Sequence, residues 1–312
     1  MVLNKGGLVM KKIFGRLVCL VGVLCVLFSS LTVYAETGKE KTEIEYELSE
    51  LEYFSELRSY TDDELYEKGL SEEQVDYIRN FDLVGAIKER AQLSESVLKD
   101  LGYTDEEIST LKSIVKRKSL SEEDILKEVK GATLTLTLNS PSTSKSRYTY
   151  NFSFRWSSCP IFIDSDLLAA TWSATGSNGQ SVNVAINKSL SSLTTKYKYT
   201  GGAPSMPDKS YKWNYVHEYR AAKLEFDMGY NLGNGMSYWT YYGSGKLVLD
   251  AVVSNTIYEV YLKFGYGHSV VTGTPSVSFS GSGPSIGMTF GLTTQNLKTY
   301  SVRYRYDGKK MS

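Results

Sequence analysis

The chain has 312 residues, of which 41% are hydrophobic and 22% are charged, and its 35 Lys and Arg residues balance its 35 Asp and Glu residues. This composition excludes wholesale disorder and is sufficient for one or two domains with buried cores. With three Cys and two His residues, a disulfide-stapled scaffold, a zinc site of the paired-cysteine type and a multi-histidine metal centre are also excluded.

The first 35 residues have the three-part pattern of a secretory signal peptide. Lys12 and Arg16 belong to a basic start, a 12-residue apolar run occupies 17–28, and Ala35 ends a small-residue cleavage site. The apolar run is shorter than the roughly 20 residues that span a bilayer. We therefore expect residues 1–35 to be cleaved, and the mature protein to be exported without a transmembrane anchor.

Cleavage would leave Cys159 as the single cysteine of the mature chain. An exported protein with one cysteine has no internal disulfide, so its fold must hold by packing alone. Such proteins are common in Gram-positive bacteria, and we expect an extracellular or cell-wall-associated location.

The composition changes sharply near Gly131. Residues 36–130 hold 26 acidic and 14 basic residues, whereas residues 131–312 hold 9 acidic and 17 basic residues. All four Trp and all six Pro residues lie in the second part. Two domains are predicted, an acidic helical module over 36–130 and a basic, aromatic-rich domain over 131–312.

The acidic part carries a degenerate repeat of helix, glycine turn and helix. Gly69–Val75 matches Gly102–Ile108, 33 positions later. Ser71 and Thr104 each precede, by three residues, a Gln or Glu that completes a capping box. Each glycine stands where the preceding helix should end in the left-handed conformation. The acidic side chains are interpreted as a solvated helical face, or as a surface that docks on the basic part.

From Gly131 onward the hydrophobic pattern has a period of two. Leucines alternate with threonines over 133–138, and aromatic residues alternate with polar ones over 148–156, as in half-buried strands. Further strands are predicted at 167–174, 181–187, 194–200, 210–230, 236–242, 245–253, 256–265, 275–281, 285–293 and 299–306. Short strands without intervening helices favour an antiparallel β-sandwich or barrel. The whole chain is thus predicted to be an α+β multidomain protein.

The signal peptide, the helical repeat ending in GYTDEEI (102–108), and the β segment opening with ATLTLTL (132–138) and YTYNFSFRW (148–156) together resemble a group of uncharacterised secreted proteins of Gram-positive bacteria. The resemblance covers most of the mature chain and implies the same location and architecture. It implies no activity.

Catalytic motifs are missing from the sequence. There is no HExxH or phosphate-binding GxxxxGK[ST] motif. The one GxSxG match, at 283–287, lies between two predicted strands and not between a strand and a helix, as a nucleophile elbow requires. Neither His217 nor His268 stands in a catalytic pattern. We predict a non-enzymatic protein without cofactor or metal, although residues distant in sequence can still converge on a site.

Aromatic and basic residues of the β segment are the candidate binding residues. Aromatic rings with a polar tip recognise sugars and partner surfaces when they are exposed, and a basic domain attracts polyanions. The candidates are Trp213, Tyr238, Trp239, Tyr241, Tyr242, Arg303 and Arg305. The predicted ligand is an anionic or glycan polymer of the cell envelope, or another secreted or surface protein, and not nucleic acid. The acidic module would then act as a cover or a spacer.

An alternative function rests on the segment 276–293. Apolar residues alternate there with small polar ones in a hairpin pattern that resembles the membrane-inserting stem of β-pore-forming toxins. Its apolar members are Val277, Phe279, Ile286, Met288, Phe290 and Leu292. A strand that crosses a membrane needs about 9–11 residues. A hairpin of a β-sandwich with one face exposed to solvent has the same alternating pattern. Both interpretations stay open at this point.

Overall fold

The computed structural model describes residues 43–46, 50–200, 206–233, 236–252, 256–271, 275–281 and 287–311, and Thr42–Ser312 forms one compact unit. The predicted signal peptide lies outside the described residues. Within the described ranges, no helix is both long and apolar enough to cross a membrane.

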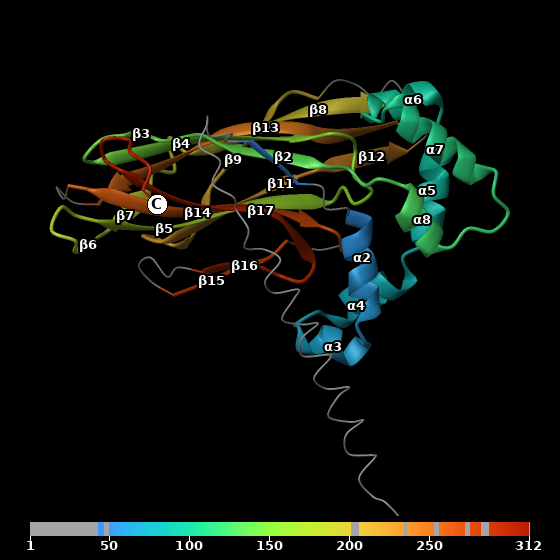
Figure 1. Ribbon diagram of the computed structural model, residues 1–312, viewed down its shortest axis with the longest axis horizontal. Helices are drawn as coiled ribbons and strands as arrows, with labels where there is room; N and C mark the ends of the chain where they lie inside the picture. Colours follow the sequence, from blue (N-terminus) through green and yellow to red (C-terminus); the bar gives the residue numbers. More distant parts are fainter. Residues whose placement is uncertain are drawn as a thin grey trace, which may run out of the picture. The chain divides into compact units, whose positions relative to one another are not determined.

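Seven short helices occupy the described residues 50–128 (Figure 1). They are α2 (Glu50–Ser59), α3 (Asp62–Glu67), α4 (Glu72–Asn80), α5 (Leu83–Gln92), α6 (Glu95–Asp100), α7 (Asp105–Val115) and α8 (Glu122–Glu128). The capping boxes predicted at Ser71 and Thr104 are confirmed. Gly69 and Gly102 have φ angles of 92° and 90°, so the predicted left-handed helix ends are confirmed as well.

The remaining described chain is mostly antiparallel sheet. Sheet A has the strand order β1 (Glu43–Tyr46), β2 (Leu134–Leu138), β4 (Arg147–Trp156), β13 (Met236–Ala251), β8 (Ser192–Thr200), β9 (Lys209–Lys212), with β3 (Ser142–Thr143), β7 (Val184–Ile186) and β12 (Gly229–Gly233) paired at its sides. Sheet B has the order β10 (Asn214–His217), β11 (Ala221–Asp227), β5 (Ser165–Thr175), β14 (Glu259–Ser269), β17 (Thr294–Arg305), with β6 (Ser181–Val182) beside β5. A separate hairpin joins β15 (Val277–Ser280) to β16 (Gly287–Phe290).

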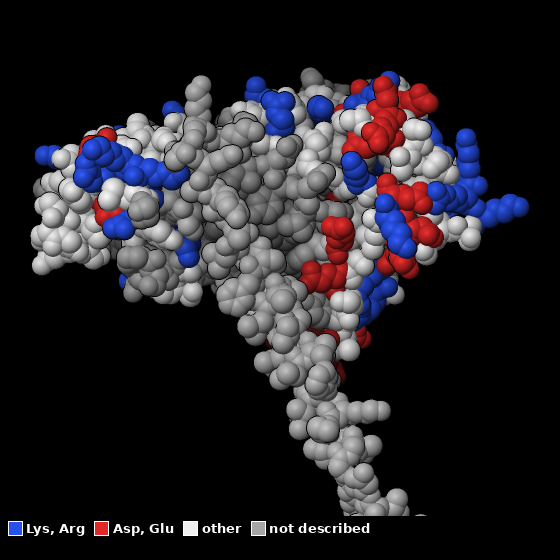
Figure 2. Space-filling model, in the orientation of Figure 1, with Lys and Arg blue, Asp and Glu red and all other residues white. Residues whose placement is uncertain are grey.

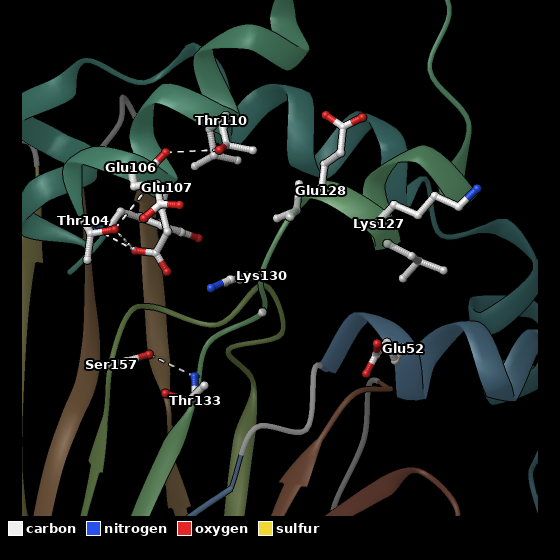
Figure 3. Close-up of a pocket in the computed structure, with 15 residues that line it drawn as sticks. Glu52, Thr104, Glu106, Glu107, Thr110, Lys127, Glu128, Lys130, Thr133 and Ser157 are labelled. Carbon is white, nitrogen blue, oxygen red and sulfur yellow. Dashed lines mark hydrogen bonds between the residues drawn. The ribbon is translucent and has the colours of Figure 1, made fainter.

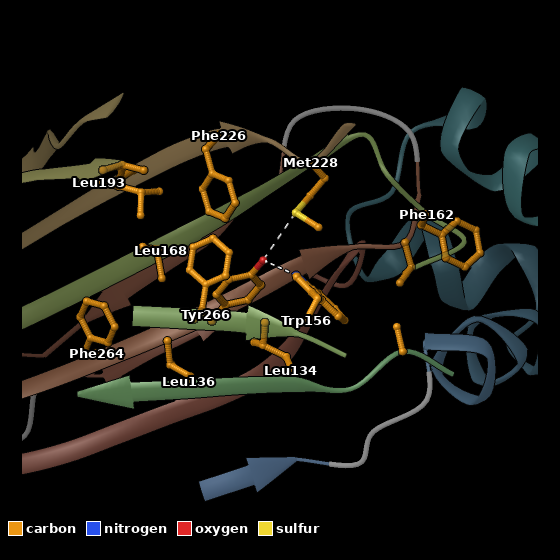
Figure 4. Close-up of a cluster of buried hydrophobic side chains, with 14 of the residues drawn as sticks. Leu134, Leu136, Trp156, Phe162, Leu168, Leu193, Phe226, Met228, Phe264 and Tyr266 are labelled. Carbon is orange, nitrogen blue, oxygen red and sulfur yellow. Dashed lines mark hydrogen bonds between the residues drawn. The ribbon is translucent and has the colours of Figure 1, made fainter. Parts of the chain in front are cut away.

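The two sheets bury their facing side chains against each other. Along β4 every second residue is buried, as the period of two predicts. The Phe154 ring stacks on Phe226 of sheet B at 5.2 Å, and Phe152 lies 5.0 Å from Phe264. Figure 4 shows Trp156 of sheet A and Tyr266 of sheet B in the same core, joined by a hydrogen bond from the indole nitrogen to the Tyr266 hydroxyl. The described strands form two sheets with edges and not a closed barrel, so of the two predicted architectures the sandwich agrees with the structure.

One predicted strand boundary is wrong. The sequence predicts two strands, 236–242 and 245–253, but β13 runs unbroken through Gly243 and Gly245 for 16 residues. A Cβ on Gly243 would lie 2.3 Å from the Phe154 ring, and one on Gly245 would lie 2.2 Å from the Ser192 carbonyl oxygen. These glycines therefore leave room for neighbouring groups inside the sheet and do not make a turn.

A second difference concerns the segment 210–230, which was expected to form one strand. It contains β9 in sheet A and β10 and β11 in sheet B. Trp213 lies between β9 and β10, where the chain passes from one sheet to the other, and its side chain is fully buried. The ring packs against Phe152 and Phe264. A large buried aromatic side chain therefore holds the point where the chain changes from sheet A to sheet B.

The helical and β segments share one hydrophobic core. Phe162, in the connection between β4 and β5, has ring centroids 5.0 Å from Phe54 of α2 and 5.2 Å from Phe81. In addition, β1, which precedes the helices, pairs with β2. The division into domains at residue 131 stays a prediction, and the unfolding experiment described in the Discussion tests it.

Candidate functional site

The outward face of sheet A brings together basic and aromatic side chains. Arg155 on β4 lies opposite Tyr242 on β13, which in turn lies opposite Lys196 on β8. Directly opposed residues on neighbouring strands point to the same face of a sheet. We call the following residues the basic tyrosine face: Arg155, Lys196, Lys198, Tyr241, Tyr242 and Lys246.

A bulge in β13 places two consecutive tyrosines on this face. The pairing with β8 shifts between Thr240 and Tyr242, so Tyr241 is the extra residue of the bulge. The Lys198 Nζ atom lies 5.4 Å from the Tyr241 ring centroid, and the Arg155 Cζ atom lies 5.4 Å from that of Tyr242. Cations at this distance from an aromatic ring attract it. Both rings are half-buried, which leaves part of each surface accessible.

The basic tyrosine face carries uncompensated positive charge. Among the described side chains, no carboxylate makes a salt bridge with Arg155, Lys196, Lys198 or Lys246. On the face drawn in Figure 2, most Asp and Glu side chains instead lie over the helices, interspersed with Lys and Arg. The face can therefore attract an anion without first breaking an internal ion pair.

A hollow of about 400 Å³ adjoins this face where α6 meets β8 and β13. It is lined by Lys99, Asp100, Tyr197, Lys198, Tyr199 and Tyr241. Two ammonium groups, one carboxylate and three tyrosines form a lining suited to a polar, anionic and partly ring-shaped ligand.

Neither of the two tryptophans predicted as binding residues is exposed on the candidate surface. The side chains of Trp213 and Trp239 are 0% and 1% exposed, so neither ring is available to a ligand. Tyr238 is half-buried and packs edge-on against Tyr197 at 5.4 Å. Tyr241 and Tyr242 remain candidate binding residues, because the bulge in β13 places both on the outward face of sheet A.

The predicted arginines of the C-terminal strand lie on sheet B and have acidic partners. Arg303 forms a salt bridge with Glu259 on the neighbouring strand β14. Arg305 pairs with Asp307 in the turn that follows β17. Because these carboxylates offset the guanidinium charges, the arginines attract a polyanion less strongly than the unpaired cations of sheet A do.

The predicted hairpin is present as β15 and β16, each only four residues long. The apolar pairs on one of its faces are Val277 with Phe290 and Phe279 with Met288. This face packs on glycines of sheet B, since a Cβ on Gly265 would lie 2.6 Å from Met288 Cε, and one on Gly267 would lie 2.6 Å from Phe290 Cδ1. Ile286 lies outside the described residues. Leu292 is half-buried, and its carbonyl oxygen accepts a hydrogen bond from the Tyr53 hydroxyl at 2.8 Å.

A buried charge cluster was missed by the sequence analysis. The Nδ1 atom of His268 lies 2.8 Å from Asp166 Oδ1, and its Nε2 atom lies 3.6 Å from Glu50 Oε2. Burial alone would lower the pKa of His268, but the Asp166 and Glu50 carboxylates outweigh it and raise this pKa to about 10. Among the described residues, no group of three His, Cys, Asp or Glu side chains is arranged to hold a metal ion. His268, Asp166 and Glu50 are all buried, so the cluster joins α2, β5 and β14 inside the fold.

A second hollow, of about 520 Å³, lies beside α7 and α8 (Figure 3). Two of its carboxylates are already engaged. Glu107 caps the first turn of α7 through Thr104, and Glu128 forms a two-pronged ion pair with Arg117 at 2.7 and 2.6 Å. These side chains are less available to a ligand than the cations of the basic tyrosine face, which have no described carboxylate partner.

Comparisons with known proteins add little to this description. No family profile and no curated protein matches the chain. The solved structure of AvmM, which catalyses macrocyclization in alchivemycin A biosynthesis, is similar at a TM-score of 0.25 and 10% identity, over 56% of this chain and 88% of that one. The delta-toxin of Clostridium perfringens is similar at a TM-score of 0.20 and 8% identity, over 58% of this chain and 88% of the toxin. TM-scores this low carry no argument about function.

Proposed function

We propose that this protein is a secreted, non-enzymatic binding protein that recognises an anionic or glycan polymer of the bacterial cell envelope. The observation that supports the proposal is the basic tyrosine face, where four cations that form no salt bridge with a described carboxylate share one sheet face with two tyrosines, and Arg155 and Lys198 lie over the tyrosine rings. The signal pattern in the sequence supports export to the place where such polymers occur.

A row of cations across neighbouring strands suits a linear polyanion. The cations of the basic tyrosine face lie on the adjacent strands β4, β13 and β8, and such strands are about 4.8 Å apart, so successive charges of one polymer have cations within reach. Sugar rings present apolar faces that stack on tyrosine, while the hydroxyl group of tyrosine accepts or donates a hydrogen bond. Surface charge attraction of this kind weakens as salt shortens the Debye length from about 10 Å at 0.1 M to about 3 Å at 1 M.

The test is co-sedimentation of the chain 36–312 with purified Gram-positive cell walls at low and high salt. We expect pelleting at low salt that falls at high salt, and at least a roughly tenfold weaker binding for the double variant Lys196→Glu/Lys198→Glu. The matched control is Lys309→Glu, which changes an exposed lysine of the C-terminal segment. Equal losses in the two variants would show only nonspecific charge attraction, and no pelleting of the unaltered chain would refute the proposal.

The hairpin supports a second candidate, a membrane-active effector. The strands β15 and β16 pair with each other and form a sheet separate from A and B, so moving them would break no strand pairing with either large sheet. In the structure their apolar face packs on Gly265 and Gly267 and would have to leave these glycines to enter a bilayer. Dye-loaded anionic liposomes, assayed in parallel, distinguish the candidates. Leakage without wall binding would favour the effector, and wall binding without leakage would exclude it.

A further inference from the structure

The end of α6 forms one side of the hollow beside the basic tyrosine face. Lys99 and Asp100 are the last two residues of this helix, and they line the hollow together with residues of β8 and of β13. Its volume of about 400 Å³ lies within the range of small-ligand sites, about 300–1,000 Å³. The helical segment thus supplies polar groups to a hollow whose other groups come from sheet A.

The turn after α6 is held against the β segment by main-chain contacts. The Cys159 amide donates a hydrogen bond to the Leu101 carbonyl oxygen at 2.7 Å. Gly102, with its φ of 90°, sits so close to the next segment that a Cβ would lie 2.7 Å from the Ser157 carbonyl oxygen. Only glycine satisfies both conditions, so this turn fixes Lys99 and Asp100 beside sheet A.

Two charged side chains from other helices hold the same connection between β4 and β5. Arg90 of α5 donates hydrogen bonds to the carbonyl oxygens of Cys159 and Pro160 at 3.1 and 3.2 Å. The Glu50 carboxylate of α2 accepts hydrogen bonds from the amides of Ile161 and Phe162, at 2.8 and 3.1 Å. Hydrogen bonds to charged groups are stronger than those between neutral groups. The helices are therefore a fixed wall of the hollow and not a loosely tethered spacer.

We infer that Lys99 and Asp100 complete the ligand site, and that the unit bound there is a phosphate-bearing sugar or polyol of the envelope polymer. The inference rests on the proposed function and deepens it. The ammonium group of Lys198, which makes no salt bridge with a described carboxylate, suits a phosphate group. Lys99 can supply a second ammonium group, because its contact with Asp105 is exposed and therefore weak. The Asp100 carboxylate accepts hydrogen bonds from hydroxyl groups, and the Tyr241 ring offers an apolar surface to a sugar. The helical segment contributes to binding and does not cover the site.

Lys99 also lies 2.9 Å from Asp105, but both side chains are more than half exposed, at 57% and 87%. Exposed pairs of this kind contribute little to stability. Replacing Lys99 should therefore leave the fold intact, and a change in binding can be assigned to the site. Lys118, an exposed lysine that follows α7 and does not line the hollow, provides the matched control.

The experiment measures binding of the chain 36–312 to polyglycerol phosphate and to polygalacturonate, a polyanion that carries carboxylates and no phosphate. We expect preference for the phosphate polymer, a roughly tenfold rise in its Kd for Lys99→Glu, a similar rise for Lys198→Glu, and no change for Lys118→Glu. Circular dichroism and the Tm of each variant establish that the fold is retained.

The outcomes separate the two proposals. If Lys198→Glu weakens binding and Lys99→Glu does not, the face binds polymer and the inference about α6 is wrong. If both polymers bind equally well, the assignment of a phosphate-bearing unit is wrong. If the unaltered chain binds neither polymer nor cell walls, the proposed function fails and the inference fails with it.

Discussion

At the scale of single residues, His268 is the clearest case of a side chain whose surroundings determine its charge. It is fully buried between Asp166 of β5 and Glu50 of α2, and Trp156 packs edge-on against its ring at 5.0 Å. Asp166 also accepts hydrogen bonds from the Tyr266 hydroxyl and the Ser269 amide. A protonated imidazole therefore bridges two carboxylates in the interior.

This charge makes stability depend on pH. The pKa of His268 is about 10 in the folded chain, against about 6.5 when unfolded, so folding favours the protonated form. Its contribution is fully present below about pH 6.5 and is lost as the pH rises toward 10. We expect the free energy of unfolding to fall by about 1 kcal/mol per pH unit between pH 7 and 8.5, as measured by urea denaturation.

The variant His268→Gln should lose this slope and roughly 3–5 kcal/mol of stability at pH 7, because it leaves buried carboxylates without their cation. His217→Gln, at an exposed position on β10, is the control and should keep the slope. A pH-independent stability of the unaltered chain over this interval would contradict the structure's charge assignment.

At the scale of elements, β13 shows how a strand accommodates bulky neighbours. Gly243 and Gly245 face the rings of Phe154 and Phe152 on β4, while Ser244 between them points to the opposite face. The small residues let β4 and β8 approach β13 from both sides. The local sequence suggests a turn, whereas packing keeps the chain extended.

Gly245→Ala should therefore destabilise the fold by about 1–3 kcal/mol through overpacking. The new Cβ would meet the Ser192 main-chain oxygen at 2.2 Å and the Phe152 ring at 2.5 Å, and a backbone atom in a sheet cannot move aside cheaply. Ser244→Ala should change stability by less than about 0.5 kcal/mol. Urea denaturation of the two variants tests this, and equal stabilities would mean that the glycine is not needed for packing.

At the scale of the whole molecule, the question is whether the helical and β segments unfold together. They share a core through Phe162, and Arg90 and Glu50 hold the connection that contains it. Two segments that share one hydrophobic core unfold in a single transition when neither part of the core persists without the other. The helices dominate the circular dichroism signal, and all four tryptophans lie in the β segment, so two probes report on the two segments separately.

We expect coincident urea midpoints for circular dichroism and tryptophan fluorescence in the unaltered chain. Arg90→Ala should move the circular dichroism midpoint to lower urea, because the carbonyl oxygens of Cys159 and Pro160 lose their donor. Arg117→Ala, which removes only an ion pair near the surface, is the control. Separate midpoints in the unaltered chain would instead support the two independent domains predicted from composition.

The sequence by itself determined the features that depend on neighbouring residues. Ser71 and Thr104 cap helices because the groups they satisfy lie three residues away, and Gly69 and Gly102 end helices because only glycine adopts a positive φ without strain. The period of two along β4 likewise reflects local strand geometry. Each of these signals is contained within a few residues.

The tertiary structure alone decided which face of each element is covered and which distant groups meet. Alternation places residues on two faces but does not say what packs on either. The rings of Trp239 and Tyr241 lie 6.3 Å apart, yet Trp239 is fully buried and Tyr241 is partly exposed, a difference that their neighbours in the fold decide. Glu50 and His268 meet although 217 residues lie between them. Such contacts arise from the arrangement of whole elements, because hydrophobic burial favours compactness without specifying partners.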